Sequence, residues 1–175
     1  MNKKIVIAID AMGGENAPIK TLEGLNLFIK KNIKKDDFFF NIFGDVEKIK
    51  KEINKYTIPQ DFYKIFESTS VVSDDETPLA SIKNSKDSSM WNSINSQITS
   101  NSNISLSAGN TGVLFVISRM LLKTIDTVSR PALAGLWPNK KNMNVVLDLG
   151  ANIECDENNL VDFAEMGSAL YKSLF

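Results

Sequence analysis

The sequence contains no histidine, one cysteine and only two arginines among its 175 residues. Without histidine, neither a Ser-His-Asp triad nor a histidine-bearing metal site can form. The single cysteine, Cys155, excludes an internal disulfide and a multi-cysteine metal site. The residues therefore predict no bound metal and no cofactor. One unpaired thiol suits a reducing compartment.

Charge of one sign and long apolar runs are also lacking. The net charge is −1, from 20 basic and 21 acidic residues, which gives no long-range field to attract nucleic acid or an anionic membrane. The apolar run at 5–9 is too short for a signal peptide, and the run at 113–122 is too short to span a bilayer. We therefore expect a cytoplasmic protein that does not bind nucleic acid.

Short apolar runs alternate with helical patterns along the chain. This alternation predicts an α/β fold, with a mostly parallel sheet and helices on both faces, in a single domain at 1–175. The predicted strands are at 5–9, 38–43, 62–66, 104–107, 132–137 and 144–149, the last as a buried strand. The predicted helices are one that contains Leu22, Leu25 and Ile29, and others at 46–55, within 79–100, at 113–122 and at about 159–174.

Four loops follow predicted strands, at 10–18, 68–78, 107–112 and 148–152. Ligands of parallel sheets bind beyond the carboxyl ends of the strands. The sequence therefore predicts that these loops converge and contain the chemistry of the protein.

The first loop begins with Asp10 and contains the pair Gly13-Gly14. Paired glycines let a backbone turn tightly and approach a ligand, and Pro18 suits the start of a helix whose amides face an anion. A simple strand-to-helix turn explains the same residues and is slightly favoured. The loop lacks the G-x-G-x-x-G pattern of dinucleotide-binding proteins.

The second loop places Gly109 and Gly112 around Asn110 and Thr111, directly before a helix. Loop amides, the Asn side chain and the Thr hydroxyl can hold a phosphate or polarise a carbonyl. Thr111 as an ordinary helix N-cap is the alternative. A cap alone does not need both glycines.

Three further groups are candidates for anion or substrate binding. Lys86, Ser88 and Ser89 lie near a helix start, where residue types alone favour a solvated and capped helix end. Asp148 and Asn152 flank a turn after a strand, and this turn suits a substrate contact and a structural role equally. Arg130 precedes a proline and has either a phosphate or a carboxylate as partner.

Together the motifs resemble the PlsX phosphate acyltransferase family of fatty acid and phospholipid synthesis. The likeness covers the chain from residue 5 to its end. The matching pieces are IAIDAMGGENAP at 7–18, FGD at 43–45, P-x4-K-x2-K-D-S-S-M at 78–90, SAGNTG at 107–112, RPAL at 130–133, LDLGAN at 147–152 and C-x4-L-x2-FA-x-MG at 155–167.

The resemblance implies a fold similar to phosphate acetyltransferases and isocitrate-dehydrogenase-like enzymes. It also implies transfer of a long-chain acyl group from acyl-carrier protein to inorganic phosphate, which needs no histidine because phosphate is already an anionic nucleophile. It assigns catalytic roles to Asn110, Thr111, Asp148 and Asn152. It assigns substrate or phosphate binding to Asp10, Gly13, Gly14, Lys86, Ser88, Ser89, Gly109, Gly112 and Arg130.

The chain departs from the family pattern in two places. Glu15-Asn16 stands where Asp-His is common, and Lys83 and Ser85 stand where Arg and Lys are common, which weakens the cationic cluster. Family members are about twice as long, so the chain corresponds to an N-terminal half. The resemblance places much of a homodimer surface and a peripheral membrane contact in the other half.

Two other functions stay open. One is a phosphotransacetylase that uses acyl-coenzyme A. The other is a non-catalytic module that binds acyl-carrier protein or another partner. A nicotinamide-dependent dehydrogenase is a distant third, because the fingerprint glycines are missing.

Overall fold

The computed structural model describes residues 4–31, 34–73, 85–99 and 101–175. The chain divides into two compact units, Met1–Leu122 and Lys123–Phe175, here called unit 1 and unit 2. The prediction of one domain at 1–175 stays a prediction. None of the helices within the described ranges is long and apolar enough to cross a membrane.

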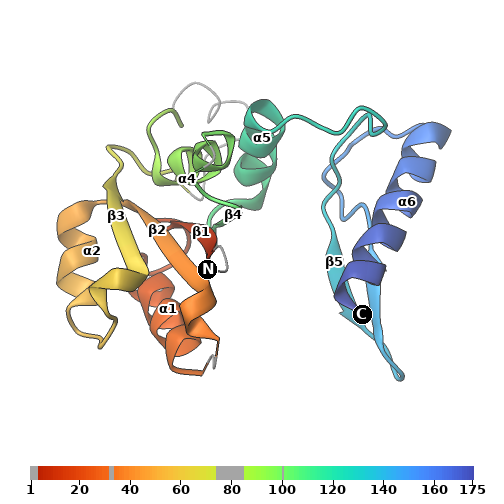
Figure 1. Cartoon of the computed structure of the whole chain (residues 1–175). Helices are drawn as coiled ribbons and strands as arrows, with labels where there is room; N and C mark the ends of the chain where they lie inside the picture. Colours follow the sequence, from red (N-terminus) through yellow and green to blue (C-terminus); the bar gives the residue numbers. More distant parts are fainter. Residues whose placement is uncertain (1–3, 32–33, 74–84, 100) are drawn as a thin grey trace. The chain divides into compact units, whose positions relative to one another are not determined.

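Unit 1 contains a four-stranded parallel sheet in the order β3-β2-β1-β4 (Figure 1). This sheet confirms the predicted α/β class with a mostly parallel sheet. The elements are β1 (Ile5–Asp10), α1 (Ile19–Lys31), η1 (Lys35–Asp37), β2 (Phe38–Gly44), α2 (Val46–Ile53), η2 (Gln60–Phe62), β3 (Tyr63–Glu67), α4 (Ser89–Ile98), β4 (Ile104–Leu106) and α5 (Thr111–Leu121).

The helices cover opposite faces of this sheet. In β1, Ile7 and Ile9 point to the face that α1 covers, where Ile9 joins a buried core with Leu22 and Leu25. The alternate face carries Ser105, whose hydroxyl donates to the carbonyl of Ser93 in α4 at 2.7 Å. Because successive strand residues point to opposite faces, α1 and α4 lie on opposite sides of the sheet.

The local sequence explains where the helices begin. The carboxylate of Asp45 accepts a hydrogen bond from the amide of Lys48 at 3.0 Å and so caps α2. In α1 the apolar residues recur at helical spacing, and Leu22, Leu25 and Ile29 are buried against the sheet. The expected helix within 79–100 is observed as α4, while positions 79–84 and 100 lie outside the described residues.

Unit 2 contains an antiparallel hairpin, β5 (Gly135–Pro138) and β6 (Met143–Val146), and the helix α6 (Glu157–Leu174). A reciprocal capping box between Asp156 and Asn159 starts this helix. The predicted strand at 132–137 begins later, and the prediction of a fully buried strand at 144–149 is wrong. The hairpin has only two strands, and α6 packs against β6. Side chains of both strands therefore stay in contact with solvent: Trp137 of β5 is 61% exposed, and Asn144 of β6 is exposed as well.

Candidate functional site

The strand order of unit 1 contains a topological switch point between β1 and β4. From β1 the chain moves through α1 to β2 and then through α2 to β3, and both strands lie on one side of β1. It then returns through α4, on the opposite face, to β4 on the other side of β1. Loops on either side of a switch point leave a crevice beyond the strand ends, where ligands of such sheets bind. The loops at 10–18 and 107–112 follow these two strands.

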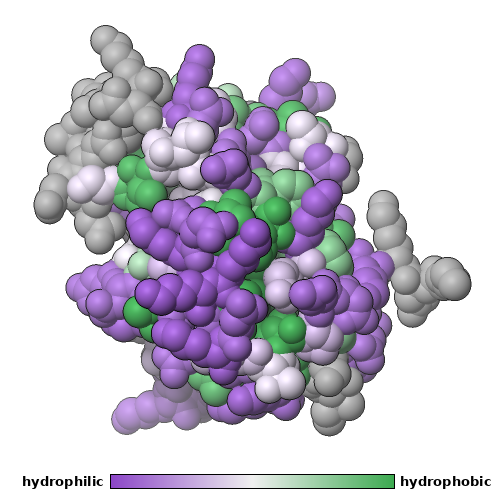
Figure 2. All heavy atoms as spheres, turned by 90° about the vertical axis from the view of Figure 1, so that its left-hand side faces the viewer, coloured by the Kyte–Doolittle hydropathy of each residue, from purple (hydrophilic) through white to green (hydrophobic). Residues whose placement is uncertain are grey.

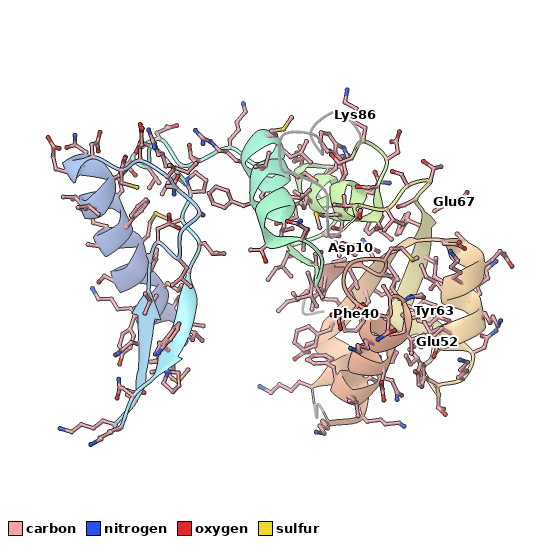
Figure 3. The ribbon with its side chains drawn as sticks, turned by 180° about the vertical axis from the view of Figure 1, so that it is seen from behind. Asp10, Phe40, Glu52, Tyr63, Glu67 and Lys86 are labelled. Atoms are coloured by element: carbon pink, nitrogen blue, oxygen red, sulfur yellow. The ribbon has the colours of Figure 1, made fainter. Side chains whose placement is uncertain are left out.

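A hydrogen-bonded bridge joins these two loops. Asp10 at the end of β1 is 1% exposed, and its Oδ2 accepts a 2.7 Å hydrogen bond from the hydroxyl of Ser107. The same hydroxyl oxygen accepts from the amide of Gly109 at 3.1 Å, while Oδ1 of Asp10 accepts from the amide of Met12 at 3.2 Å. Figure 3 shows Asp10 in the interior of unit 1. Asp10 thus fixes both loops relative to each other.

Glycines let the loops touch backbone to backbone. A Cβ atom at Gly13 would lie 2.5 Å from Asp10 Oδ2 and 2.9 Å from the amide nitrogen of Gly109. Gly14 has φ +89°, and a Cβ there would lie 2.7 Å from the carbonyl oxygen of Ala108. A plain strand-to-helix turn does not explain these contacts, because they join two loops from different strands.

The loop after β4 leads directly into the N-terminus of α5. Asn110 is the N-cap, and its Oδ1 accepts from the amide of Val113 at 3.1 Å. The alternative of Thr111 as N-cap is therefore wrong, since Thr111 is the first helical residue and is exposed. Gly112 is also exposed in the first turn, where helix amides lack carbonyl partners of their own.

The N-terminus of α4 lies next to the same loop. A Cβ at Gly109 would lie 2.8 Å from the methyl group of Met90. Ser88 is the N-cap and accepts from the amide of Trp91 at 3.1 Å, which confirms the expected cap. Ser88 and Ser89 are both buried. Lys86, in contrast, is exposed and points away from the body of unit 1 (Figure 3).

The segment after β3 contacts the same helix start. The amide of Thr69 donates to the carbonyl of Asp87, and the amide of Ser89 donates to the carbonyl of Ser70, both at 3.2 Å. Three of the four predicted loops of the chain thus meet within unit 1. Lys83, which the family comparison of the motif at 78–90 singled out, lies outside the described residues.

A second cluster of candidate residues lies in unit 2. Asp148 accepts hydrogen bonds from the amides of Leu133 at 2.9 Å and Asn152 at 2.7 Å, and from the Asn152 side chain at 3.1 Å. The Asn152 side chain also donates to the carbonyl of Pro131 at 2.9 Å. Arg130 donates through Nη1 to the carbonyl of Glu154 at 2.6 Å. These bonds tie the loop at 148–152 to the segment at 130–133.

The hydrogen bonds keep Asp148 ionised. Burial acts to raise the pKa of Asp148, but the bonds from Leu133 and Asn152 outweigh burial and lower the pKa below its usual range. Oδ1 of Asp148 accepts from Leu133 and Oδ2 accepts from Asn152, so the carboxylate is suited to hold the two segments together and unsuited to donate a proton near neutral pH.

One residue of the site escaped the sequence reasoning. Ser107 was not a candidate, although its hydroxyl links Asp10 to the second loop. A serine at the end of a short strand gives no signal of its own. Only its pairing opposite β1, which a single sequence does not reveal, identifies it.

Comparison with known proteins agrees with the motifs. The family model described as "Fatty acid synthesis protein" matches residues 5–175. The chain belongs to this family. It is 50% identical over 175 residues to the phosphate acyltransferase of Pelagibacter ubique, and the alignment covers 100% of the chain and 51% of that relative. The resemblance to the PlsX phosphate acyltransferases is thereby confirmed.

Other relatives give the same picture. The chain is 39% identical over 170 residues to the phosphate acyltransferase of Ehrlichia ruminantium, which covers 97% of the chain and 50% of that relative. It is 36% identical over 174 residues to that of Rhodospirillum rubrum, with 99% and 49% covered. The chain spans about half the length of the curated relatives it matches.

Proposed function

We propose that this chain forms part of a phosphate acyltransferase, which transfers a long-chain acyl group from acyl-carrier protein to inorganic phosphate. The observation that supports this most is the junction of two glycine-rich loops at the switch point, held by the Asp10–Ser107 hydrogen bond. The N-termini of α4 and α5 lie against this junction, and helix N-termini favour anions.

The reaction follows from positioning and charge. A phosphate oxygen attacks the thioester carbonyl carbon, forming a C–O bond, and the C–S bond then breaks. The hydrogen of the phosphate monoanion or dianion passes to the leaving thiolate of the carrier, so acyl phosphate and free thiol result. Such chemistry requires alignment of the two reactants and donors for the developing oxyanion.

The proposal assigns phosphate binding to groups at the start of α4 and in the first loop. Ser88 is buried, and its hydroxyl oxygen accepts from the amide of Trp91 to cap α4. In this proposal its hydrogen donates to a phosphate oxygen bound at this helix start. Ser89 adds a further proposed phosphate contact. Lys86 is exposed and points away from unit 1, so in this proposal its side chain turns toward the phosphate on binding. In this proposal Gly13 and Gly14 allow close approach of the backbone to the phosphate. Arg130 stays a predicted anion contact within unit 2.

The second loop is proposed to stabilise the oxyanion. Asn110 caps α5 through Oδ1, and the proposed oxyanion contact is made by its side-chain NH₂ group. Thr111 and the amides between Gly109 and Gly112 would add donors. Asp10, and in unit 2 Asp148 with Asn152, would hold the loops in position.

The test is thiol release from a long-chain acyl-carrier protein, with and without phosphate. We would use the chain joined to the second half of the Pelagibacter relative, because the chain alone spans half of such proteins. Phosphate-dependent release supports the proposal. Release from acyl-coenzyme A but not from acyl-carrier protein would favour the phosphotransacetylase alternative. Binding of the carrier without release would favour a non-catalytic module.

Three further properties belong to this proposal. We expect the enzyme in the cytoplasm, where acyl-carrier protein is the donor. We expect a homodimer of the longer enzyme and a peripheral membrane contact, through which the product reaches glycerol-3-phosphate acylation. Sedimentation and vesicle flotation of the joined protein would test the last two expectations.

A further inference from the structure

The two edges of the parallel sheet differ in character. The β3 edge carries the exposed charged residues Lys64 and Glu67, the usual protection of a free edge. Figure 2, which views the side of Figure 1 where β3 and α2 lie, shows mostly hydrophilic side chains. The β4 edge has no charge within Ile104–Leu106, and Ile104 and Leu106 are 53% and 58% exposed.

The exposed apolar side chains of β4, Ile104 and Leu106, point to the same face of the sheet as α1. Ile104 is the register partner of Ile7, and Leu106 that of Ile9, so all four side chains share one face. The helix α1 packs over β1 and β2 and leaves β4 uncovered on this face. A hollow of about 590 Å³ results between α1 and β4.

This hollow has mainly apolar walls. Its apolar lining consists of Ile7, Ile9, Leu25, Phe28, Phe40 and Leu106. Gly24 of α1 also lines it, and a Cβ at Gly24 would meet no atom within 4 Å. A glycine on a helix face lets a second helix approach closely, so the hollow suits a packed secondary-structure element.

The neighbouring helix α5 shows the same lack of cover. Its segment at 111–121 is apolar on most sides, yet only Val113 and Ile117 are buried in it. Met120 is 50% exposed. A helix with so broad an apolar surface, interrupted here only near Ser118 and Arg119, is normally buried in a larger core.

We propose that β4 is an internal strand of a larger sheet. Its second neighbour is a strand from the half of the enzyme that the curated relatives possess beyond the matched region, and a helix of that half fills the hollow against Gly24 and Leu106. The relatives are about twice as long as the chain, so their second half contains enough polypeptide to provide such a strand and helix. Within the described residues, the outer edge of β4 has no strand partner.

A polypeptide segment fits better than a lipid chain. A fatty acyl chain fills an apolar hollow but offers no hydrogen bonds to the outer backbone of β4, and unpaired strand groups are costly once covered. A strand pairs with this edge and brings its helix with it. The hollow also reaches Asp10, Gly13 and Ser107, so the docked segment would form one wall of the candidate site.

The first test is co-expression of the chain with the second half of the Pelagibacter relative, followed by capture through a tag on the chain. We expect a 1:1 complex. Leu106→Lys and Gly24→Phe should weaken capture at least about tenfold, because one buries a charge and the other blocks the helix. Neither substitution touches the residues assigned to phosphate or oxyanion.

Matched controls separate this surface from general hydrophobicity. Ile153→Lys removes an isoleucine that is 99% exposed in unit 2, and Glu23→Phe adds a phenylalanine on α1 outside the hollow. Both should be captured like the unchanged chain. Equal capture of Leu106→Lys and the unchanged chain would overturn the proposal, and so would the absence of any complex.

Hydrogen exchange gives an independent readout that does not depend on the enzyme being active. The Asn103 amide donates to the carbonyl of Val6 in β1, so the amides of Ile104 and Leu106 face the outer edge and should exchange fast in the chain alone, and at least about tenfold more slowly in the joined protein. Equal rates would overturn the proposal. Protection of these amides by palmitate alone would assign the hollow to an acyl chain. A dimer of the chain that Leu106→Lys dissociates would assign it to a second copy. Either result would overturn the proposal while leaving the acyl transfer untouched.

Discussion

The hydroxyl of Ser107 donates a 2.7 Å hydrogen bond to the carboxylate of Asp10, across 97 positions of sequence. Asp10 is buried, and the two residues stand at the ends of neighbouring parallel strands. This one bond therefore sets the spacing of the loops on both sides of the switch point. The stability of unit 1 and the geometry of the candidate site both depend on it.

Removal of either partner should destabilise unit 1. Ser107→Ala leaves a buried carboxylate with one hydrogen bond fewer, and we expect a loss of about 1–3 kcal/mol in the free energy of unfolding. Asp10→Asn should cost a similar amount. The double variant should cost less than the sum, because both substitutions break the same bond.

Urea unfolding followed by the fluorescence of Trp91 measures this effect. Trp91 lies in unit 1, and a Trp137→Phe background removes the signal of unit 2. Ser173→Ala, in α6 of unit 2, is the control and should leave the transition unchanged. Strict additivity of the two substitutions would show that the bond contributes nothing.

Two glycines of unit 1 should respond in opposite ways to alanine. Gly13→Ala would place a methyl group 2.5 Å from the Asp10 carboxylate and 2.9 Å from the Gly109 backbone, so a loop must move. We expect a loss on the order of 1–3 kcal/mol or more, as for other overpacked sites. Gly24→Ala meets no atom within 4 Å and should stabilise α1 by about 0.5–1 kcal/mol. Thermal unfolding of the two variants side by side checks this, and equal midpoints would contradict it.

The sequence predicted the parallel sheet well, for a physical reason. Runs such as 5–9 and 38–43 are rich in apolar residues because the strands are covered on both faces, and this pattern is local. The strand at 144–149 was misjudged because the same apolar pattern occurs in β6, which lies in a two-stranded antiparallel hairpin. The apolar pattern of a strand shows which side chains can be buried, but the strands and helices packed around it determine which side chains are buried.

The candidate site was predicted only in outline. The glycine pairs and the caps are local signals, so the loops at 10–18 and 107–112 were found. Ser107 was missed, and the structural alternative for this loop placed the N-cap on Thr111, whereas the observed N-cap is Asn110. Both errors concern which side chain within a loop makes a given bond. Register with a distant strand decides this, and one sequence does not show register.

Asp148 should make the stability of unit 2 depend on pH. The pKa of Asp148 is below that of an unfolded aspartate, about 3.9, because amides of Leu133 and Asn152 bind its ionised form against the opposing effect of burial. Between the lowered pKa and about pH 5, the unfolded state binds more protons than the folded state, so the free energy of unfolding rises with pH. The contribution is complete above about pH 5 and is lost as pH falls through the lowered pKa.

Trp137 fluorescence in a Trp91→Phe background follows unit 2 alone. Asp148→Asn should reduce its stability at pH 7 by about 1 kcal/mol, because the donors lose a charged acceptor, and should flatten the dependence between about pH 5 and pH 3. Asp126→Asn, at an exposed position of the same unit, should keep the dependence of the unchanged chain. An undiminished slope in the Asp148→Asn variant would assign the dependence to other carboxylates.

Ser88 allows helix capping and phosphate binding to be separated. Ser88→Ala removes the cap and should cost about 1 kcal/mol of stability, whereas Ser88→Gly should cost only a few tenths of a kcal/mol, because glycine is tolerated at an N-cap. Both substitutions remove the hydroxyl that we propose as a phosphate donor. In the joined enzyme both should therefore raise the KM for phosphate, by about tenfold for one lost hydrogen bond to a charged group.

Ser96→Ala is the matched control, since Ser96 is also buried in α4 but donates to the carbonyl of Ser93 near the other end of the helix. It should leave the KM for phosphate unchanged. If Ser88→Gly had an unchanged KM while Ser88→Ala raised it, the effect would come from the helix start, through the position of its amides. The hydroxyl would then be a cap alone, and phosphate would be held by the backbone of α4 and its neighbours.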